Sequence, residues 1–128
     1  MELPVVNHPD YVAKINDDNK FPIQKFTALA KYLLKEGVVK KFYTPKECSI
    51  KTMQSSHSLE YINHIKNKSL DLKLQKKIGF PINDSVARRS FLATGGTVLA
   101  SKLALDSKLA CNTAGGSHHA TFDCGAGY

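Results

Sequence analysis

The chain has 128 residues, of which 42% are hydrophobic and 23% charged, and its formal net charge is +7 at pH 7. This length corresponds to one domain or less, and the composition excludes an intrinsically disordered chain. The positive charge comes from lysines scattered over helix-like segments, with no arginine cluster interleaved with aromatic residues, so we do not expect nucleic acid as a partner.

The cysteines and the N-terminus indicate the compartment. Cys48, Cys111 and Cys124 are odd in number and widely spaced, so no disulfide framework is expected. The opening MELPVV lacks the basic, apolar and small-residue order of a signal peptide, and no apolar run is long enough to span a bilayer. These features predict a cytoplasmic protein without a membrane partner.

The first part of the chain predicts a strand, a helix and a second extended stretch. Leu3–Val6 is rich in β-branched residues and predicts the strand. Residues 23–36 predict the helix, and Gly37 is placed to end it. One apolar stripe is expected along this helix, at spacings of three and four residues, from Phe26, Leu29, Ala30, Leu33 and Leu34. The second extended stretch covers residues 38–43.

Short helices follow. Ser49 is expected to cap a helical turn over Ile50–Met53, and Ser58 to cap a helix over Leu59–Asn67. A further short helix is predicted within residues 70–78 and ends at Gly79.

The longest helix is predicted from Val86 to about Asp106, with Asp84 or Ser85 as its N-cap. Two glycines in its middle, Gly95-Gly96, cost about 1 kcal/mol each relative to alanine. We therefore expect another backbone to approach closely there, with a break in the helix as the alternative. Arg88 and Arg89 are expected on a solvated or ion-paired face.

An apolar run over residues 108–112 follows this helix and predicts a further strand. Because helices separate the extended runs, the chain predicts an α/β fold with a parallel sheet flanked by helices. Ligands bind beyond the carboxyl ends of such strands, and the final loop, which opens with Gly115-Gly116, carries His118 and His119 to that place. Two imidazoles in one loop can position a water molecule and carry its proton, so both are candidate catalytic residues.

Two other interpretations of this loop remain open. One is a zinc site made by His118, His119, Asp123 and Cys124, although neighbouring residues rarely direct both side chains at one ion and no second Cys or His pair has zinc-finger spacing. The other is structural: the glycine pair forms a turn and the histidines are ordinary polar groups. We favour the catalytic interpretation and expect no metal ligand in this chain.

The segment AGGSHHA at 114–120, followed by GAGY at 125–128, resembles the active-site loop of the histone deacetylase family, including its acetoin-utilisation-like and acetylpolyamine-amidohydrolase-like bacterial members. Four earlier segments are similar to this family in the same order: LPVVNHPDYV at 3–12, KFPIQKF at 20–26, HSLEYI at 57–62 and RRSFLATGGTVLAS at 88–101. The resemblance implies that residues 1–128 are the N-terminal portion of a single arginase/deacetylase-like domain, cut at the strand after the His-His loop.

This resemblance implies a zinc-dependent hydrolase that removes acetyl or other acyl groups from lysine or polyamine amines. By motif match, His118 and His119 are its catalytic proton-transfer residues, and Gly127 and Tyr128 line the substrate tunnel. The family's zinc ligands, an Asp-x-His pair and a further Asp, lie downstream of this loop, as does its oxyanion-stabilising tyrosine, and this chain contains no Asp-x-His pair. We therefore expect zinc in the complete domain but not in this chain alone, and no activity from it alone.

Two alternative functions remain open. The chain is half of a split enzyme completed by a partner chain, or it is a non-catalytic binding or scaffold module with a basic surface.

The chain departs from the family at Asn19-Lys20, where a His-Arg pair is common, and at Tyr128, where phenylalanine is usual. Two further histidines have open roles. His57 packs or caps a helix, or reaches the active site, and His8 is a loop polar group or faces the mouth of the site.

Overall fold

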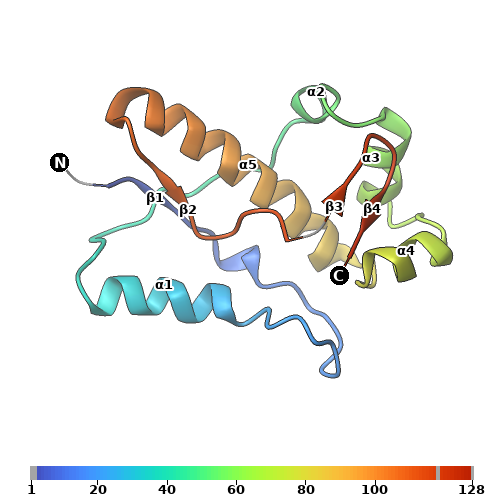
Figure 1. The fold of residues 1–128 in the computed structure, drawn as a ribbon, viewed down its shortest axis with the longest axis horizontal. Coiled ribbons are helices and arrows are strands. Elements are labelled where there is room, and N and C mark those ends of the chain that lie inside the picture. Colours follow the sequence, from blue (N-terminus) through green and yellow to red (C-terminus); the bar gives the residue numbers. More distant parts are fainter. Residues whose placement is uncertain (1–2, 118, 128) are drawn as a thin grey trace.

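The computed structural model describes residues 3–117 and 119–127. Its elements, in chain order, are β1 (Val5–Val6), the 3-10 helix η1 (Pro9–Tyr11), α1 (Lys25–Lys35), α2 (Ile50–Met53), α3 (Leu59–Lys66), α4 (Leu72–Ile78), α5 (Asp84–Ser107), β2 (Cys111–Asn112), β3 (His119–Ala120) and β4 (Gly125–Ala126). Helix α5 runs diagonally through the molecule, with β1, β2 and α1 on one side and α2, α3, α4 and the β3–β4 hairpin towards the other (Figure 1).

Strand β1 is the middle of a small parallel arrangement. It pairs in parallel with β2, with Val5 opposite Cys111. On its other edge the Tyr43 backbone nitrogen donates to the carbonyl of Val5 at 2.9 Å, and Asn7 nitrogen donates back to the carbonyl of Tyr43 at 3.0 Å. Segments from the start, the middle and the end of the chain therefore lie side by side. The predicted α/β class with parallel pairing is confirmed.

Side-chain oxygens begin α2 and α3 where the sequence predicts them. The hydroxyl of Ser49 accepts from the backbone nitrogen of Thr52, and that of Ser58 accepts from Tyr61 nitrogen, both at 3.1 Å. Each bond satisfies one of the donors that a helix start leaves without a partner. Both predicted caps are confirmed.

Glycines in the left-handed region end α1 and α4. Gly37 has φ of 66° and Gly79 has φ of 84°. After α1, Gly37 nitrogen donates to the carbonyl of Leu34 and Val38 nitrogen donates to that of Leu33, the pair of bonds that defines a Schellman motif. Both predicted helix ends are confirmed.

The start of α5 differs from the prediction. Asn83, and neither Asp84 nor Ser85, is the N-cap of α5: its Oδ1 accepts from Val86 nitrogen at 3.0 Å. Its Nδ2 also donates to the carbonyl of Lys14 at 2.9 Å, so a distant segment selects this residue as the cap.

In α1 only Phe26 is buried, and the predicted stripe is wrong at Leu29 and Leu34, whose exposed fractions are 42% and 47%. Helix α1 packs against η1. The helical periodicity of apolar residues therefore overstates how much of α1 the rest of the described chain covers.

Gly95 and Gly96 let two segments touch α5. A Cβ atom at Gly95 would overlap the carbonyl oxygen of Lys46 and lie 3.0 Å from the backbone nitrogen of Cys48. A Cβ atom at Gly96 would overlap the hydroxyl of Tyr11. The predicted approach of another backbone is confirmed at Gly95, while Gly96 faces a side chain. The alternative of a helix break is wrong, because α5 is continuous through both glycines.

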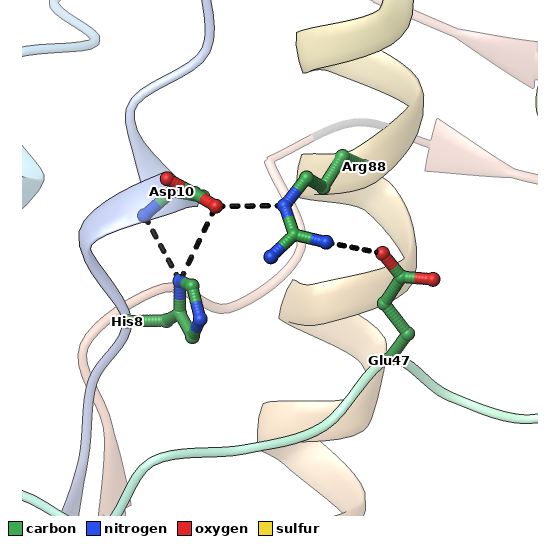
Figure 2. A network of polar contacts seen from close by, with 4 residues as sticks. All are labelled: His8, Asp10, Glu47 and Arg88. Atoms are coloured by element: carbon green, nitrogen blue, oxygen red, sulfur yellow. Dashed lines mark hydrogen bonds and ion pairs between the residues drawn. The ribbon is translucent and has the colours of Figure 1, made fainter.

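Arg88 joins three segments on the surface (Figure 2). Its Nε lies 2.7 Å from Oδ2 of Asp10 in η1, and its Nη1 lies 2.7 Å from Oε1 of Glu47. Both carboxylates raise the pKa of Arg88, and the main cause is the hydrogen bond that Arg88 donates to Asp10. Beside it, Nδ1 of His8 accepts from Asp10 nitrogen at 3.0 Å. The predicted ion-paired face is confirmed for Arg88.

Arg89 does not lie on that face, so the prediction of a solvated or ion-paired side chain is wrong for it. Only 7% of its surface is exposed, and its Nε donates to the carbonyl of Tyr11 at 2.8 Å. The physical reason is helical spacing: Arg89 lies three residues after Val86 and four before Ala93, both buried. It therefore shares the inward face of α5.

The core gathers around the N-terminal half of α5. Its largest fully buried side chains are Tyr11, Leu92 and Val6. Cys48, Cys111 and Cys124 are all free in the structure. Among the residues that the structure describes, no helix has the length and apolar character needed to cross a membrane.

Candidate active site

Asn112, the last residue of β2, fastens the start of the final loop. Its Oδ1 accepts from the hydroxyl of Tyr11 at 2.9 Å, and its Nδ2 donates to the carbonyl of Ala114 at 3.0 Å. Thr113 adds a second tie, because its hydroxyl donates to Oδ1 of Asn7 at 2.8 Å, just beyond β1. The loop therefore leaves the sheet at the carboxyl ends of two parallel strands.

The loop then folds into a hairpin that carries His119. Strands β3 and β4 pair antiparallel, with His119 opposite Ala126. The turn between them is closed by Thr121, whose backbone nitrogen donates to the carbonyl of Cys124 at 2.8 Å and whose hydroxyl donates to the same oxygen at 3.1 Å. Sequence reasoning predicted an irregular loop here and missed this hairpin. It holds the backbone of His119 in a defined place, while the His119 side chain stays exposed.

His57 and Ser58, at the start of α3, hold the tip of the hairpin. Nδ1 of His57 lies 2.9 Å from the carbonyl oxygen of Thr121, and Ser58 nitrogen donates to the carbonyl of Phe122 at 2.8 Å. Because a carbonyl can only accept, Nδ1 of His57 is the donor in this bond. The His57 ring also packs edge-on against Tyr61 at 5.8 Å.

The second strand of the hairpin rests on α4. Gly127 nitrogen donates to the carbonyl of Lys77 at 2.7 Å. A Cβ atom at Gly125 would lie 3.0 Å from the hydroxyl of Tyr61 and 3.4 Å from Cγ1 of Ile78, so little room remains for a side chain there. Burial raises the pKa of Tyr61, and the Cys124 thiol adds to this effect. The hairpin is thus fixed at its tip and at its end.

A cavity of about 510 Å³ opens between this hairpin and helices α2, α3 and α5. Its lining includes His57, Ser117 and His119, together with apolar side chains and several further serine and threonine hydroxyls. Ligand sites in proteins occupy about 300–1,000 Å³ and combine apolar walls with a few polar groups. The cavity has the size and character of such a site.

The predicted site residues fall in different places. His118 and Tyr128 lie outside the described residues. His119 is exposed and lines the cavity, and Gly127 lies at the end of the hairpin, half-buried. His8 does not line the cavity: its Nδ1 caps η1, so of its two open roles the structure shows the polar one.

A metal ion finds no ligand set in the described part of the chain. There, no three His, Cys, Asp or Glu side chains gather closely enough to hold one. Cys124, a member of the alternative zinc site, instead has its sulfur 3.1 Å from the hydroxyl of Thr121 and 3.8 Å from Nζ of Lys77. Asp123 is exposed. The described residues do not fit the zinc ion that the family resemblance implies.

Sequence reasoning did not single out Tyr11 and Asn112, the pair that positions the loop. Tyr11 is completely buried, and this burial raises the pKa of Tyr11 to about 12. The phenol is therefore neutral near pH 7 and donates to Asn112. A polar residue that ends an apolar strand directly before a glycine-rich loop was the available signal for Asn112.

Comparison with known proteins agrees with this geometry. Residues 19–128 match the histone deacetylase domain. An uncharacterized protein of Picosynechococcus sp. is 40% identical over 130 residues, which cover 100% of this chain and 43% of that protein. Histone deacetylase 2 of Arabidopsis thaliana is 28% identical over 124 residues, 84% of this chain and 30% of that one. The chain thus spans less than half of the length of these curated relatives.

A solved structure shares the fold. The crystal structure of an HDAC homolog complexed with SAHA superposes with a TM-score of 0.77 at 21% identity, over 96% of this chain and 36% of that one. The architecture is therefore part of a deacetylase-like hydrolase fold. With the domain match over residues 19–128, the chain belongs to the histone deacetylase family.

Proposed function

We propose that this chain supplies the proton-transfer histidines of a zinc-dependent deacetylase-family hydrolase that acts on acylated lysine or polyamine amines. The observation that carries the proposal is the position of His119, which lines a ligand-sized cavity on a hairpin held by α3 and α4, in a loop that leaves two parallel strands at their carboxyl ends. The family match over residues 19–128 includes this hairpin. Residues 1–128 form the N-terminal portion of one such domain.

In this proposal His118 and His119 handle the proton of the attacking water. An imidazole titrates near neutral pH, so one ring accepts that proton and one returns a proton to the leaving amine. His119 is exposed to the cavity, as such a transfer requires. Gly127 and Tyr128 flank the substrate chain, and a glycine lets that chain pass close to the backbone.

The zinc ligands of the proposed hydrolase come from outside the described residues, because residues 3–117 and 119–127 contain no suitable group of three. The chain alone is inactive in this proposal. A second polypeptide that completes the domain would make it one half of a split enzyme.

Reconstitution tests the proposal. The chain is mixed with the part of the Picosynechococcus relative that it does not match, in the presence of zinc, and deacetylation of acetyl-lysine peptide and acetylpolyamine is measured. We expect activity only in the mixture, and a loss of about 100-fold or more in kcat/KM for His118→Ala and for His119→Ala.

His64→Ala is the matched control. His64 lies on α3, where it binds Ser69 and Glu60, and it does not line the cavity. It should leave the activity of the mixture unchanged. A mixture without activity, or activity that survives both the His118 and the His119 substitutions, would contradict the proposed function.

A further inference from the structure

The histidine just before α3 uses its side chain on the hairpin and not on the helix. Ser58 is the N-cap of α3, and its hydroxyl accepts from Tyr61 nitrogen. Nδ1 of His57 instead donates to the carbonyl of Thr121 at 2.9 Å, because a carbonyl oxygen can only accept. Of the roles left open for His57, capping of α3 is therefore excluded.

The start of α3 holds the hairpin through three groups. Beside the carbonyl that His57 binds, the carbonyl of Phe122 accepts from Ser58 nitrogen at 2.8 Å. On the second strand, a Cβ atom at Gly125 would lie only 3.0 Å from the hydroxyl of Tyr61. The rings of His57 and Tyr61 pack edge-on, with centroids 5.8 Å apart. The start of α3 therefore contacts both sides of the turn between β3 and β4.

The bond from His57 lies close in the chain to His119. Strand β3 begins at His119, and the carbonyl that His57 holds belongs to Thr121, directly after this strand. His57 and His119 also line the same cavity. Before the hairpin, an added Cβ atom at Gly115-Gly116 would meet nothing within 4 Å, so packing at these glycines does not fix where the hairpin lies. The place of His119 depends on the contacts that hold the hairpin itself.

We propose that His57 is a positioning residue for His119, a role that rests on the hydrolase function proposed above. By holding the Thr121 carbonyl, the imidazole fixes the end of β3 and with it the place of the His119 backbone. A displacement of about 1 Å can lower the rate of a reaction about 100-fold, so reacting groups need neighbours that hold them. His57 acts through the hairpin and not on the substrate.

Amide hydrogen exchange of the chain alone tests the hold on the hairpin without any measurement of activity. The Ser58 amide is the reporter, because its partner is the Phe122 carbonyl at the tip. In His57→Ala its protection factor should fall about fivefold or more, the effect of one lost hydrogen bond. The Cys48 amide, which bonds to the carbonyl of Phe91 in α5, should keep its protection. Unchanged protection at Ser58, or an equal fall at both amides, would overturn the proposal.

Two amide variants distinguish a donor at the place of Nδ1 from general packing. The side-chain nitrogen of asparagine can take this place and donate to the Thr121 carbonyl, whereas that of glutamine lies further from the backbone. In the reconstituted mixture, His57→Ala and His57→Gln should lower kcat about tenfold or more, with KM changed less than about twofold. His57→Asn should restore most of kcat. His64→Ala, on the same helix, is the matched control and should keep the parent kcat.

The failure of the positioning role and the failure of the proposed function give different results. A parent mixture without activity contradicts the proposed function, and hydrogen exchange of the chain alone then decides whether His57 holds the hairpin. An active parent mixture in which His57→Ala keeps the parent kcat contradicts the positioning role alone. An asparagine variant as slow as the alanine variant contradicts it as well.

Discussion

Two Gly-Gly pairs stand in this chain, one inside α5 and one in the loop that leads to His119. At Gly95-Gly96 an added Cβ atom would overlap the carbonyl of Lys46 or the hydroxyl of Tyr11. At Gly115-Gly116 it would meet nothing within 4 Å. Neither of the loop glycines has a positive φ.

Packing therefore requires glycine at Gly95 and Gly96. At Gly115 and Gly116, neither a contact with the described chain nor a positive φ requires it. The same dipeptide therefore has a different structural role in α5, where we call it the scaffold pair, than in the loop. The scaffold pair lets the segment before α2, and Tyr11 of η1, lie directly on α5. Loop glycines that nothing crowds fit a segment that leaves room for a ligand.

Gly95→Ala should have the largest effect on stability. The atom it meets belongs to the backbone, and the same segment is held on α5 by a bond from Cys48 nitrogen to the carbonyl of Phe91 at 2.9 Å. The segment cannot easily move away. We expect the free energy of unfolding to fall by about 3 kcal/mol, although alanine favours a helix by about 1 kcal/mol over glycine. A urea titration measures it, and a change below about 1 kcal/mol would refute the crowding argument.

The stability of the protein at alkaline pH tests the burial of Tyr11, the side chain that lies against Gly96. The folded pKa of Tyr11, about 12, lies above the ordinary value of 10.0. Above pH 10 the unfolded chain loses this proton while the folded chain keeps it. The contribution of the protonated Tyr11 phenol to the free energy of unfolding is therefore complete below pH 10 and is lost as pH rises towards 12. This fall should reach about 2–3 kcal/mol. Tyr11→Phe should show a shallower decline between pH 10 and 12, and parallel curves for the two proteins would contradict the assignment.

Gly96→Ala should cost less than Gly95→Ala, about 2 kcal/mol, since it meets a side chain and not backbone. Tyr11→Phe removes the hydroxyl that the new methyl group overlaps. The double variant should therefore be more stable than the sum of the two single changes predicts, by about 1 kcal/mol. Strict additivity in unfolding titrations would show that Tyr11 is not what Gly96 accommodates.

Gly115→Ala and Gly116→Ala should have the smallest effect, within about 0.5 kcal/mol of the parent chain. No atom blocks the added methyl group, and no positive φ disfavours it. Thermal unfolding of both variants checks this. A loss as large as that of Gly96→Ala would erase the contrast between the two pairs.

Local signals in the sequence were enough for the helix ends. Ser49, Ser58 and Gly37 act through bonds within three to five residues, so their positions alone predict them. Asn83 was missed because three successive residues can cap α5, and the choice depends on a bond to Lys14 far away in the sequence. Tertiary contacts decide such cases.

The site was predicted only in part, for the same reason. The motif at 114–120 indicates the family and the loop of His119, but not the hairpin, whose tip is held by His57 from another part of the chain. Arg88 and Arg89 are identical neighbours in the sequence. Their difference could be read only from the buried face that Val86, Arg89 and Ala93 share at helical spacing.

The pairing of β1 with distant segments has a consequence for how the chain acquires its structure during synthesis. Tyr11 and Asn112 are 101 residues apart, and Asn7 and Thr113 are 106 apart. At about 5–20 residues per second, β1 is synthesised about 5–20 s before these partners. The backbone hydrogen bonds within helices α1 to α5 join residues close in sequence, whereas closing so long a loop is slow. Strand β1 is thus synthesised early, and its pairing with β2 forms late. The loop that carries His119 takes its position only when β2 and Thr113 bind to β1 and Asn7.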